Sequence, residues 1–150
     1  MRNAVIISGI YLAGLAITVH YALNHNAVVS DRIAEYQIYL ECIKTGIWTF
    51  GVDLVNSCPM ATLIPAYIQR VSGFDKYTLF AVYPSFFYAL MPVFIYKISL
   101  RFMEWRYAIL ASAITLSNFY FMYYSNMGRF SVAMGVWAIL IWALIEKKVW

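Results

Sequence analysis

Two carboxylates stand four residues apart near position 30 of the sequence. Asp31 and Glu35 would project from one face of a helix, because residues i and i+4 are neighbours on a helical surface. Paired carboxylates suit a general base or a ligand pair for a divalent cation such as Mg²⁺ or Mn²⁺. The alternative is a solvated helix face on which Arg32 lies close to both acids. Both interpretations stay open from the spacing alone.

An arginine stands where an apolar run begins. Arg129 follows the short polar turn 125–128, so we expect it at a helix N-terminus, where free N–H groups and the helix dipole favour anions. Guanidinium binds phosphate in a bidentate manner, which makes Arg129 a candidate phosphate ligand. The alternative is an arginine that extends to lipid headgroups. Arg70 is a second candidate of the same kind, with a headgroup contact as its simpler interpretation.

Other reactive residues form no recognisable site. His20 and His25 have no partner at metal-binding spacing, and no glycine-rich phosphate loop occurs. Cys42 and Cys58 fall in the same predicted loop and would form a disulfide in an oxidising compartment. They would otherwise be two small apolar residues on adjacent helices.

The composition indicates a membrane protein. Of 150 residues, 63% are hydrophobic and only 12% are charged, and the mean hydropathy is +0.69. A soluble domain carries about 25% charged residues to wet its surface. We therefore expect an all-α, polytopic membrane protein that forms a single membrane domain over residues 1–150.

Four segments are apolar enough to cross a bilayer, which takes roughly 20 residues. They are residues 4–23, 77–96, 107–124 and 130–145. The first segment resembles a signal peptide, but its length and the absence of a small-residue cleavage site favour a retained helix. Pro84 and Pro92 should bend the second segment and free carbonyls that neighbouring helices must satisfy. Gly9 and Ala13 give the first segment a small-residue packing face.

The charges predict the orientation. With the N-terminus in the cytoplasm, the inner segments carry six basic and two acidic residues, whereas the outer segments carry five of each. Basic residues next to short loops stay in the cytoplasm. The net charge of +4 is thus a topology signal in a cell-membrane protein, and it gives no support to nucleic-acid binding. The long loop between the first two spans is then extracytoplasmic.

That loop should contain two amphipathic helices, over residues 30–46 and 58–72. In the first, apolar residues recur at helical spacing, namely Ile33, Tyr36, Leu40, Ile43 and Ile47. In the second they are Met60, Leu63, Ile64, Tyr67, Ile68 and Val71. Gly46 and Gly73 suit the helix ends, and Pro65 should kink the second helix. Both helices should lie at the outer membrane interface or pack on a partner.

The chain resembles the beginning of the GT-C glycosyltransferases, polytopic enzymes that take sugars from polyprenyl-phosphate donors. More narrowly, it is similar to the N-terminal half of an uncharacterised family of archaeal multi-pass membrane proteins. The segments that carry the resemblance are residues 31–36, 56–65, 82–84 with Pro92, and 128–129. They lie within a stretch from about Ser30 to Ile145, so the resemblance covers most of the chain.

The resemblance implies that Asp31 is the catalytic base or metal-binding acid, supported by Glu35 and Tyr36, and that Arg129 faces the donor phosphate. The chain departs from the pattern between Asp31 and Glu35, where a histidine and a glycine would be expected, and in ending after four spans. We therefore expect a membrane glycosyltransferase, or the N-terminal module of one, acting on an acceptor hydroxyl at the outer face. The alternative is a non-enzymatic small subunit that packs with other subunits in a membrane complex.

Overall fold

The computed structural model describes residues 2–25, 32–47, 59–118, 121, 123–124 and 128–146. Within these ranges the regular secondary structure is helical throughout, as predicted. The helices are α1 (Arg2–Asn24), α2 (Arg32–Thr45), α3 (Pro59–Ser72), α4 (Lys76–Tyr88), α5 (Leu90–Ser99), α6 (Trp105–Ser117) and α8 (Gly128–Ile145).

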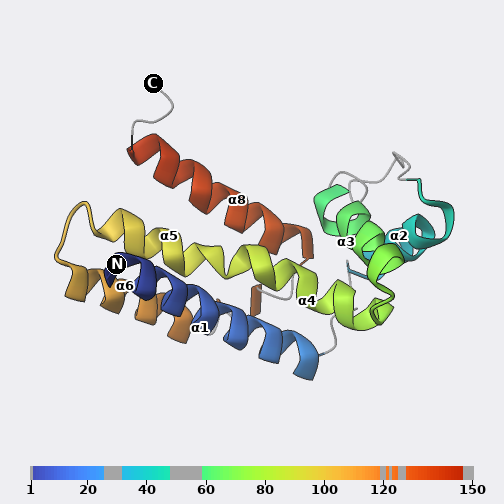
Figure 1. The fold of residues 1–150 in the computed structure, drawn as a ribbon, viewed down its shortest axis with the longest axis horizontal. Coiled ribbons are helices and arrows are strands. Elements are labelled where there is room, and N and C mark those ends of the chain that lie inside the picture. The colour runs from blue at the N-terminus through green and yellow to red at the C-terminus, as the bar shows by residue number, and fades with distance from the viewer. Residues whose placement is uncertain are drawn as a thin grey trace.

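In the part of the chain that the structure describes, three helical units are long and apolar enough to cross a membrane, namely Arg2–Asn24, Lys76–Ser99 and Gly128–Ile145. The second combines α4 and α5 and lies at the centre of the bundle (Figure 1). Half of its most apolar window is buried in the protein, against 17% for α1 and 22% for α8. Large side chains on the outer helices, such as Leu12 and Trp137, point away from the bundle, as expected for surfaces that face lipid.

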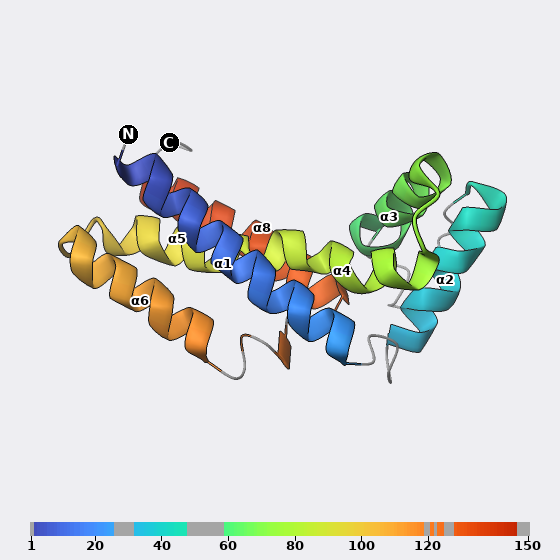
Figure 2. The same ribbon diagram turned by 60° about the horizontal axis from the view of Figure 1, so that its bottom comes forward.

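The bundle has two distinct ends, because α1 and α8 both run antiparallel to α4–α5 (Figure 2). We call the end with Asn24, Lys76 and Gly128 the loop end, since α2 and α3 lie there. The opposite end contains the beginning of α1 and the last turns of α5 and α8. We call it the basic end, for the arginines and lysine described below.

The third predicted span differs from the structure. A single helix over residues 107–124 was expected, but α6 ends at Ser117, and Asn118 has extended backbone angles (φ −74°, ψ 127°). At 1.5 Å per residue, its 13 residues cover about 20 Å, less than the hydrocarbon core of about 30 Å. Hydropathy did not reveal the end of the helix, because the residues that follow Asn118 are again apolar and aromatic.

The central helical unit is interrupted close to Pro92. Pro92 cannot donate a hydrogen bond to the carbonyl of Tyr88, and α4 ends at Tyr88, with Ala89 between it and α5. At its other end α4 is capped by Asp75, whose Oδ2 accepts a hydrogen bond from the Thr78 amide at 2.7 Å. This hydrogen bond holds the pKa of the Asp75 carboxyl below its ordinary value.

The prediction for the packing face of α1 was wrong. A Cβ added at Gly9 would meet nothing, whereas Gly14 lies in van der Waals contact with Ala89 and Pro92. The buried face of α1 is therefore the one that carries Gly14, and its buried residues are Ile10, Gly14, Thr18 and Ala22. Small residues lie at both possible faces of this helix, so composition could not identify the one that packs.

The two loop helices end as predicted. Gly46 follows α2 with a φ of 74° and Gly73 follows α3 with a φ of 69°, both in the left-handed region that glycine tolerates. Helix α3 packs on α2 and α4. Its buried residues are mostly small, namely Ala61, Thr62, Pro65 and Ala66. The predicted apolar stripe instead points outward, with Tyr67 and Val71 strongly exposed, which suits a helix at a membrane interface.

The face that α2 packs against the bundle differs from its apolar stripe by about one residue. Ile33 is exposed, while the buried residues are Arg32, Glu35, Tyr39 and Cys42. Apolar periodicity could not find this face because two of its four members are charged. Their burial depends on partners that lie far away in the sequence.

Candidate functional site

The candidate site is a buried charge cluster at the loop end, formed by Arg32, Glu35 and Arg129. Arg32 and Glu35 come from the first turn of α2 and are only 5% and 3% exposed. Arg129 comes from the first turn of α8, and its side chain is 36% exposed. The cluster thus has a closed interior and one cation at its surface.

Arg32 is held by α4. Its Nη2 donates a hydrogen bond to the carbonyl oxygen of Phe80 at 3.1 Å, and its guanidinium lies 4.4 Å from the centre of the Phe80 ring. In an unbroken helix that carbonyl would accept from residue 84, but Pro84 has no N–H. Arg32 therefore supplies the donor that Pro84 lacks, as expected for a carbonyl freed by a proline.

Burial also acts on the charge of Arg32. Desolvation lowers its pKa to about 10, and the attraction of Glu35 partly opposes this change. The guanidinium remains a cation at neutral pH, because even the lowered pKa is well above 7.

Glu35 connects α2 to α8. Its Oε1 lies 3.5 Å from Arg129 Nε, and its Oε2 lies 3.9 Å from Arg32 Nε. The close approach depends on Gly128, because a Cβ added there would collide with Glu35 Oε2 and lie 3.1 Å from Arg32 Nε. One carboxylate thus lies beside two guanidinium groups, and these three side chains together carry a charge of +1. The arrangement favours an additional anion over a cation at this point.

Aromatic side chains form one wall of the site. The Tyr36 ring centre lies 5.9 Å from that of Tyr39, 5.0 Å from that of Phe80 and 6.3 Å from that of Tyr77. Burial raises the pKa of both Tyr36 and Tyr39, so both phenols are neutral at physiological pH. Tyr36 is the more accessible of the two.

The structure brings together two of the predicted site residues, Glu35 and Arg129, while the Tyr36 ring packs against Phe80, the residue whose ring also lies beside Arg32. Asp31 lies outside the described residues and directly precedes α2 in the sequence. Arg70 is not part of the cluster. It lies at the other end of α2, against Gly46, where Tyr67 also donates a hydrogen bond to the Gly46 carbonyl at 3.0 Å. A cation there is favourably placed near the helix C-terminus.

The predicted cysteine pair is described only in part. Cys42 has a free thiol that is buried among Tyr39, Ala66 and Phe80, and burial raises the pKa of that thiol. Cys58 lies outside the described residues.

Sequence reasoning missed two members of the site. Arg32 and Gly128 stand in segments that resemble the family, but neither of them was assigned a role in the site. Their roles depend on Phe80 and Glu35, which are distant in sequence. Pro84 was the available signal, since a proline within a span requires a donor from another element.

The described residues do not fit a divalent cation. No group of three or more His, Cys, Asp or Glu side chains in the described ranges is arranged to hold a metal. Both oxygens of Glu35 already lie beside guanidinium groups, which would repel Mg²⁺ or Mn²⁺.

Comparison of the chain with protein-family models, with curated proteins and with solved structures gave no match in any of the three.

Proposed function

We propose that this chain is a GT-C-like membrane glycosyltransferase, or the N-terminal module of one, that uses a polyprenyl-phosphate sugar donor. The observation that carries the proposal is the contact between Glu35 and Arg129. It joins the first-loop helix, which follows Asp31 in the sequence, to the arginine expected to bind the donor phosphate. Two regions almost one hundred residues apart, which the family resemblance treats as one site, therefore meet at the loop end.

The geometry supports different roles for the two acids. Glu35 is 3% exposed and both of its carboxylate oxygens lie beside guanidinium groups, so it is not open to an acceptor hydroxyl. We assign Glu35 a positioning role, in which it holds the Arg129 guanidinium towards the donor. Asp31 remains the candidate base.

In the proposed reaction, Asp31 accepts the proton of an acceptor hydroxyl, and the hydroxyl oxygen attacks the anomeric carbon of the sugar. The bond from that carbon to the phosphate oxygen breaks, and the polyprenyl phosphate leaves with the bonding electrons. Arg129 stabilises the negative charge that develops on the leaving phosphate. Tyr36 lies on the same helix as Glu35 and contributes an aromatic surface for the sugar ring.

The position of the helices supports a fourth crossing. Helix α5 ends at the basic end, while α8 begins at the loop end beside Glu35. The chain between them must therefore traverse the bundle, and α6 begins this path by packing back along α5. We infer that α6 belongs to a fourth crossing. With the N-terminus in the cytoplasm, the loop end would then face the outside of the cell.

The test uses the full chain reconstituted in vesicles with synthetic short-chain polyprenyl-phosphate hexoses. We expect release of polyprenyl phosphate by the parent chain and none by the Asp31→Asn variant, with equal membrane insertion. Glu41→Gln is the matched control, because it removes one negative charge from the exposed face of α2. Equal release by the Asp31→Asn variant and the parent would refute the mechanism.

One observation favours the alternative of a non-enzymatic subunit. The apolar face of α3 is uncovered, including Tyr67 and Val71, and a partner protein would cover it as well as a membrane surface would. A stoichiometric partner that co-purifies in mild detergent, and that is lost in a Tyr67→Ser variant, would support this function. Retention of the chain as a monomer would count against it.

A further inference from the structure

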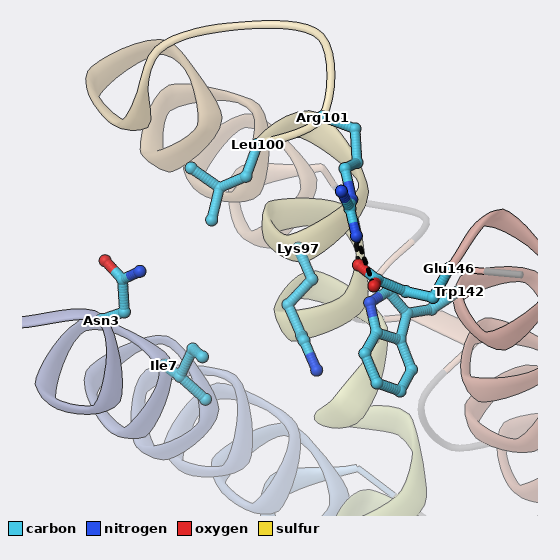
Figure 3. Close-up of a pocket in the computed structure, with 7 residues that line it drawn as sticks. All are labelled: Asn3, Ile7, Lys97, Leu100, Arg101, Trp142 and Glu146. Atoms are coloured by element: carbon cyan, nitrogen blue, oxygen red, sulfur yellow. Dashed lines mark hydrogen bonds and ion pairs between the residues drawn. The ribbon is translucent and has the colours of Figure 1, made fainter. Parts of the chain in front are cut away.

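A second polar site lies at the basic end, far from Glu35. A cavity of about 290 Å³ opens between the first turn of α1 and the last turns of α5 and α8 (Figure 3). The residues that line it are Asn3, Ile7, Lys97, Leu100, Arg101, Trp142 and Glu146. Among the described residues, all three helical units that are long enough to cross a membrane begin or end here, so a bilayer that they span has its boundary at the cavity.

Two cations reach the cavity from α5 and the turn that follows it. The Lys97 ammonium lies 3.3 Å from the centre of the Trp142 ring and 5.4 Å from that of Phe94. These cation–π contacts hold the ammonium in place. Arg101 Nε donates a hydrogen bond to Glu146 Oε1 at 2.9 Å, and half of the arginine side chain is exposed. Figure 3 shows Asn3 and Ile7 of α1 on the opposite side of the cavity.

Further cations lie at the same end of the bundle without lining the cavity. The Arg2 and Arg106 guanidinium groups lie 5.1 Å and 5.5 Å from the centre of the Trp105 ring. Glu104 directly precedes this tryptophan. Together with Lys97, Arg101 and Glu146, the described residues at this end therefore carry four cations and two carboxylates. Tryptophan and arginine together are typical of the headgroup layer of a bilayer.

We propose that this cavity binds the phosphate headgroup of an anionic membrane lipid. Lys97 and Arg101 would contact the phosphate, while Ile7 and Leu100 provide an apolar wall for the adjoining glycerol and acyl carbons. Basic pockets between membrane helices bind anionic headgroups in this way. A lipid is favoured over a soluble phosphate because the cavity combines cations with apolar side chains at the boundary of the membrane. The site is independent of the proposed transferase, whose residues lie at the loop end.

Glu146 gives the proposal a distinctive prediction. Its carboxylate and the lipid phosphate compete for Arg101, so Glu146→Gln should strengthen lipid binding about tenfold. Lys97→Gln should weaken binding about tenfold, because it removes a charge-assisted contact, while Lys97→Arg should keep it. A purely structural role of the Arg101–Glu146 pair would instead make Glu146→Gln weaken binding together with stability.

The experiment measures lipid retained by the full chain in detergent, using native mass spectrometry with phosphatidylglycerol, phosphatidylcholine and inorganic phosphate as probes. Arg106→Gln is the matched control, since it removes a cation from the same end without lining the cavity. We expect retention of phosphatidylglycerol, no retention of phosphatidylcholine, and no competition by inorganic phosphate.

Three results would overturn the proposal. Equal losses in the Lys97→Gln and Arg106→Gln variants would indicate diffuse attraction to a basic surface. Equal retention of both lipids would exclude recognition of charge. Displacement by inorganic phosphate at equal concentration would indicate a soluble anion as the ligand. A Lys97→Gln variant that fails to fold is replaced by Glu146→Gln, whose expected gain in binding cannot arise from misfolding.

Discussion

Replacing Glu35 with glutamine tests whether the buried charge cluster holds the loop helices on the bundle. The change keeps the shape of the side chain and removes the carboxylate that lies between Arg32 and Arg129. Arg32, which is 5% exposed, would then stay buried without the charge of Glu35. Helix α2 should consequently detach from α4 and α8 more often.

The magnitude follows from burial. Breaking a buried ion pair by removing one partner costs about 3 kcal/mol or more. Arg129 is partly exposed, so its share of the pairing is screened by water and most of the cost arises at Arg32. A cost of about 3 kcal/mol corresponds to roughly a 100-fold larger population of the detached state. Gly128→Ala should act in the same direction with a smaller effect of about 1 kcal/mol, because the added Cβ displaces the Glu35 carboxylate.

Cys42 provides the assay. Its thiol is buried between α2, α3 and α4 and becomes accessible when α2 detaches. In a Cys58→Ser background, the labelling rate of Cys42 by a soluble maleimide reports the detached population. We expect the rate to rise about 100-fold in the Glu35→Gln variant.

Lys44→Gln is the control, because Lys44 lies on the exposed face of the same helix. Its labelling rate should equal that of the parent. An unchanged rate in the Glu35→Gln variant would refute the reasoning, since the buried pair would then contribute nothing to docking. An equal rise in the Lys44→Gln variant would also refute it, because the effect would reflect net charge on α2.

Two further predictions concern the bundle itself. A Cβ at Gly135 would collide with the backbone of Phe87, whereas a Cβ at Gly9 meets open space. Gly135→Ala should therefore lower the thermal unfolding midpoint in detergent, while Gly9→Ala should leave that midpoint unchanged or raise it. A lower midpoint for Gly9→Ala than for Gly135→Ala would contradict the packing. Hydrogen bonds lower the pKa of the Asp75 carboxyl in the folded protein. The cap therefore stabilises α4 fully when the pH is above the pKa that this carboxyl has in the unfolded chain, and the stabilisation is lost as the pH falls through its pKa in the folded protein. The protection of the Thr78 amide from hydrogen exchange, corrected for intrinsic rates, should decrease as the pH is lowered in the parent chain. In an Asp75→Ala variant this protection should already be weak at neutral pH. Equal protection in both proteins at neutral pH would count against the cap.

Much of the fold could be predicted from local signals. Glycine, proline and capping residues act on their immediate neighbours, so the ends of α2 and α3 at Gly46 and Gly73 were found from sequence. Uninterrupted apolar runs likewise located α1, the α4–α5 unit and α8. The early end of α6 at Ser117 had no such signal.

The site was less predictable, because burial of charge depends on distant partners. Apolar spacing on α2 favoured a face with Ile33, whereas the buried face contains Arg32 and Glu35. The partners of these two side chains are a carbonyl on α4 and an arginine on α8. A pattern within one helix cannot specify such contacts. The family resemblance implied that the segment around Glu35 and Arg129 serve one site, but not that the two side chains pair.

The hydrogen bond from Arg32 to the Phe80 carbonyl also constrains how the protein assembles. The Phe80 carbonyl is available to Arg32 in this way only when the chain around Pro84 is helical, because residue 84 is then its helical hydrogen-bond partner and proline has no N–H to donate. During synthesis α2 emerges before α4, so this hydrogen bond can form only after the later helix has been made. The position of α2 on the bundle is therefore fixed by a part of the chain that is translated 48 residues after Arg32.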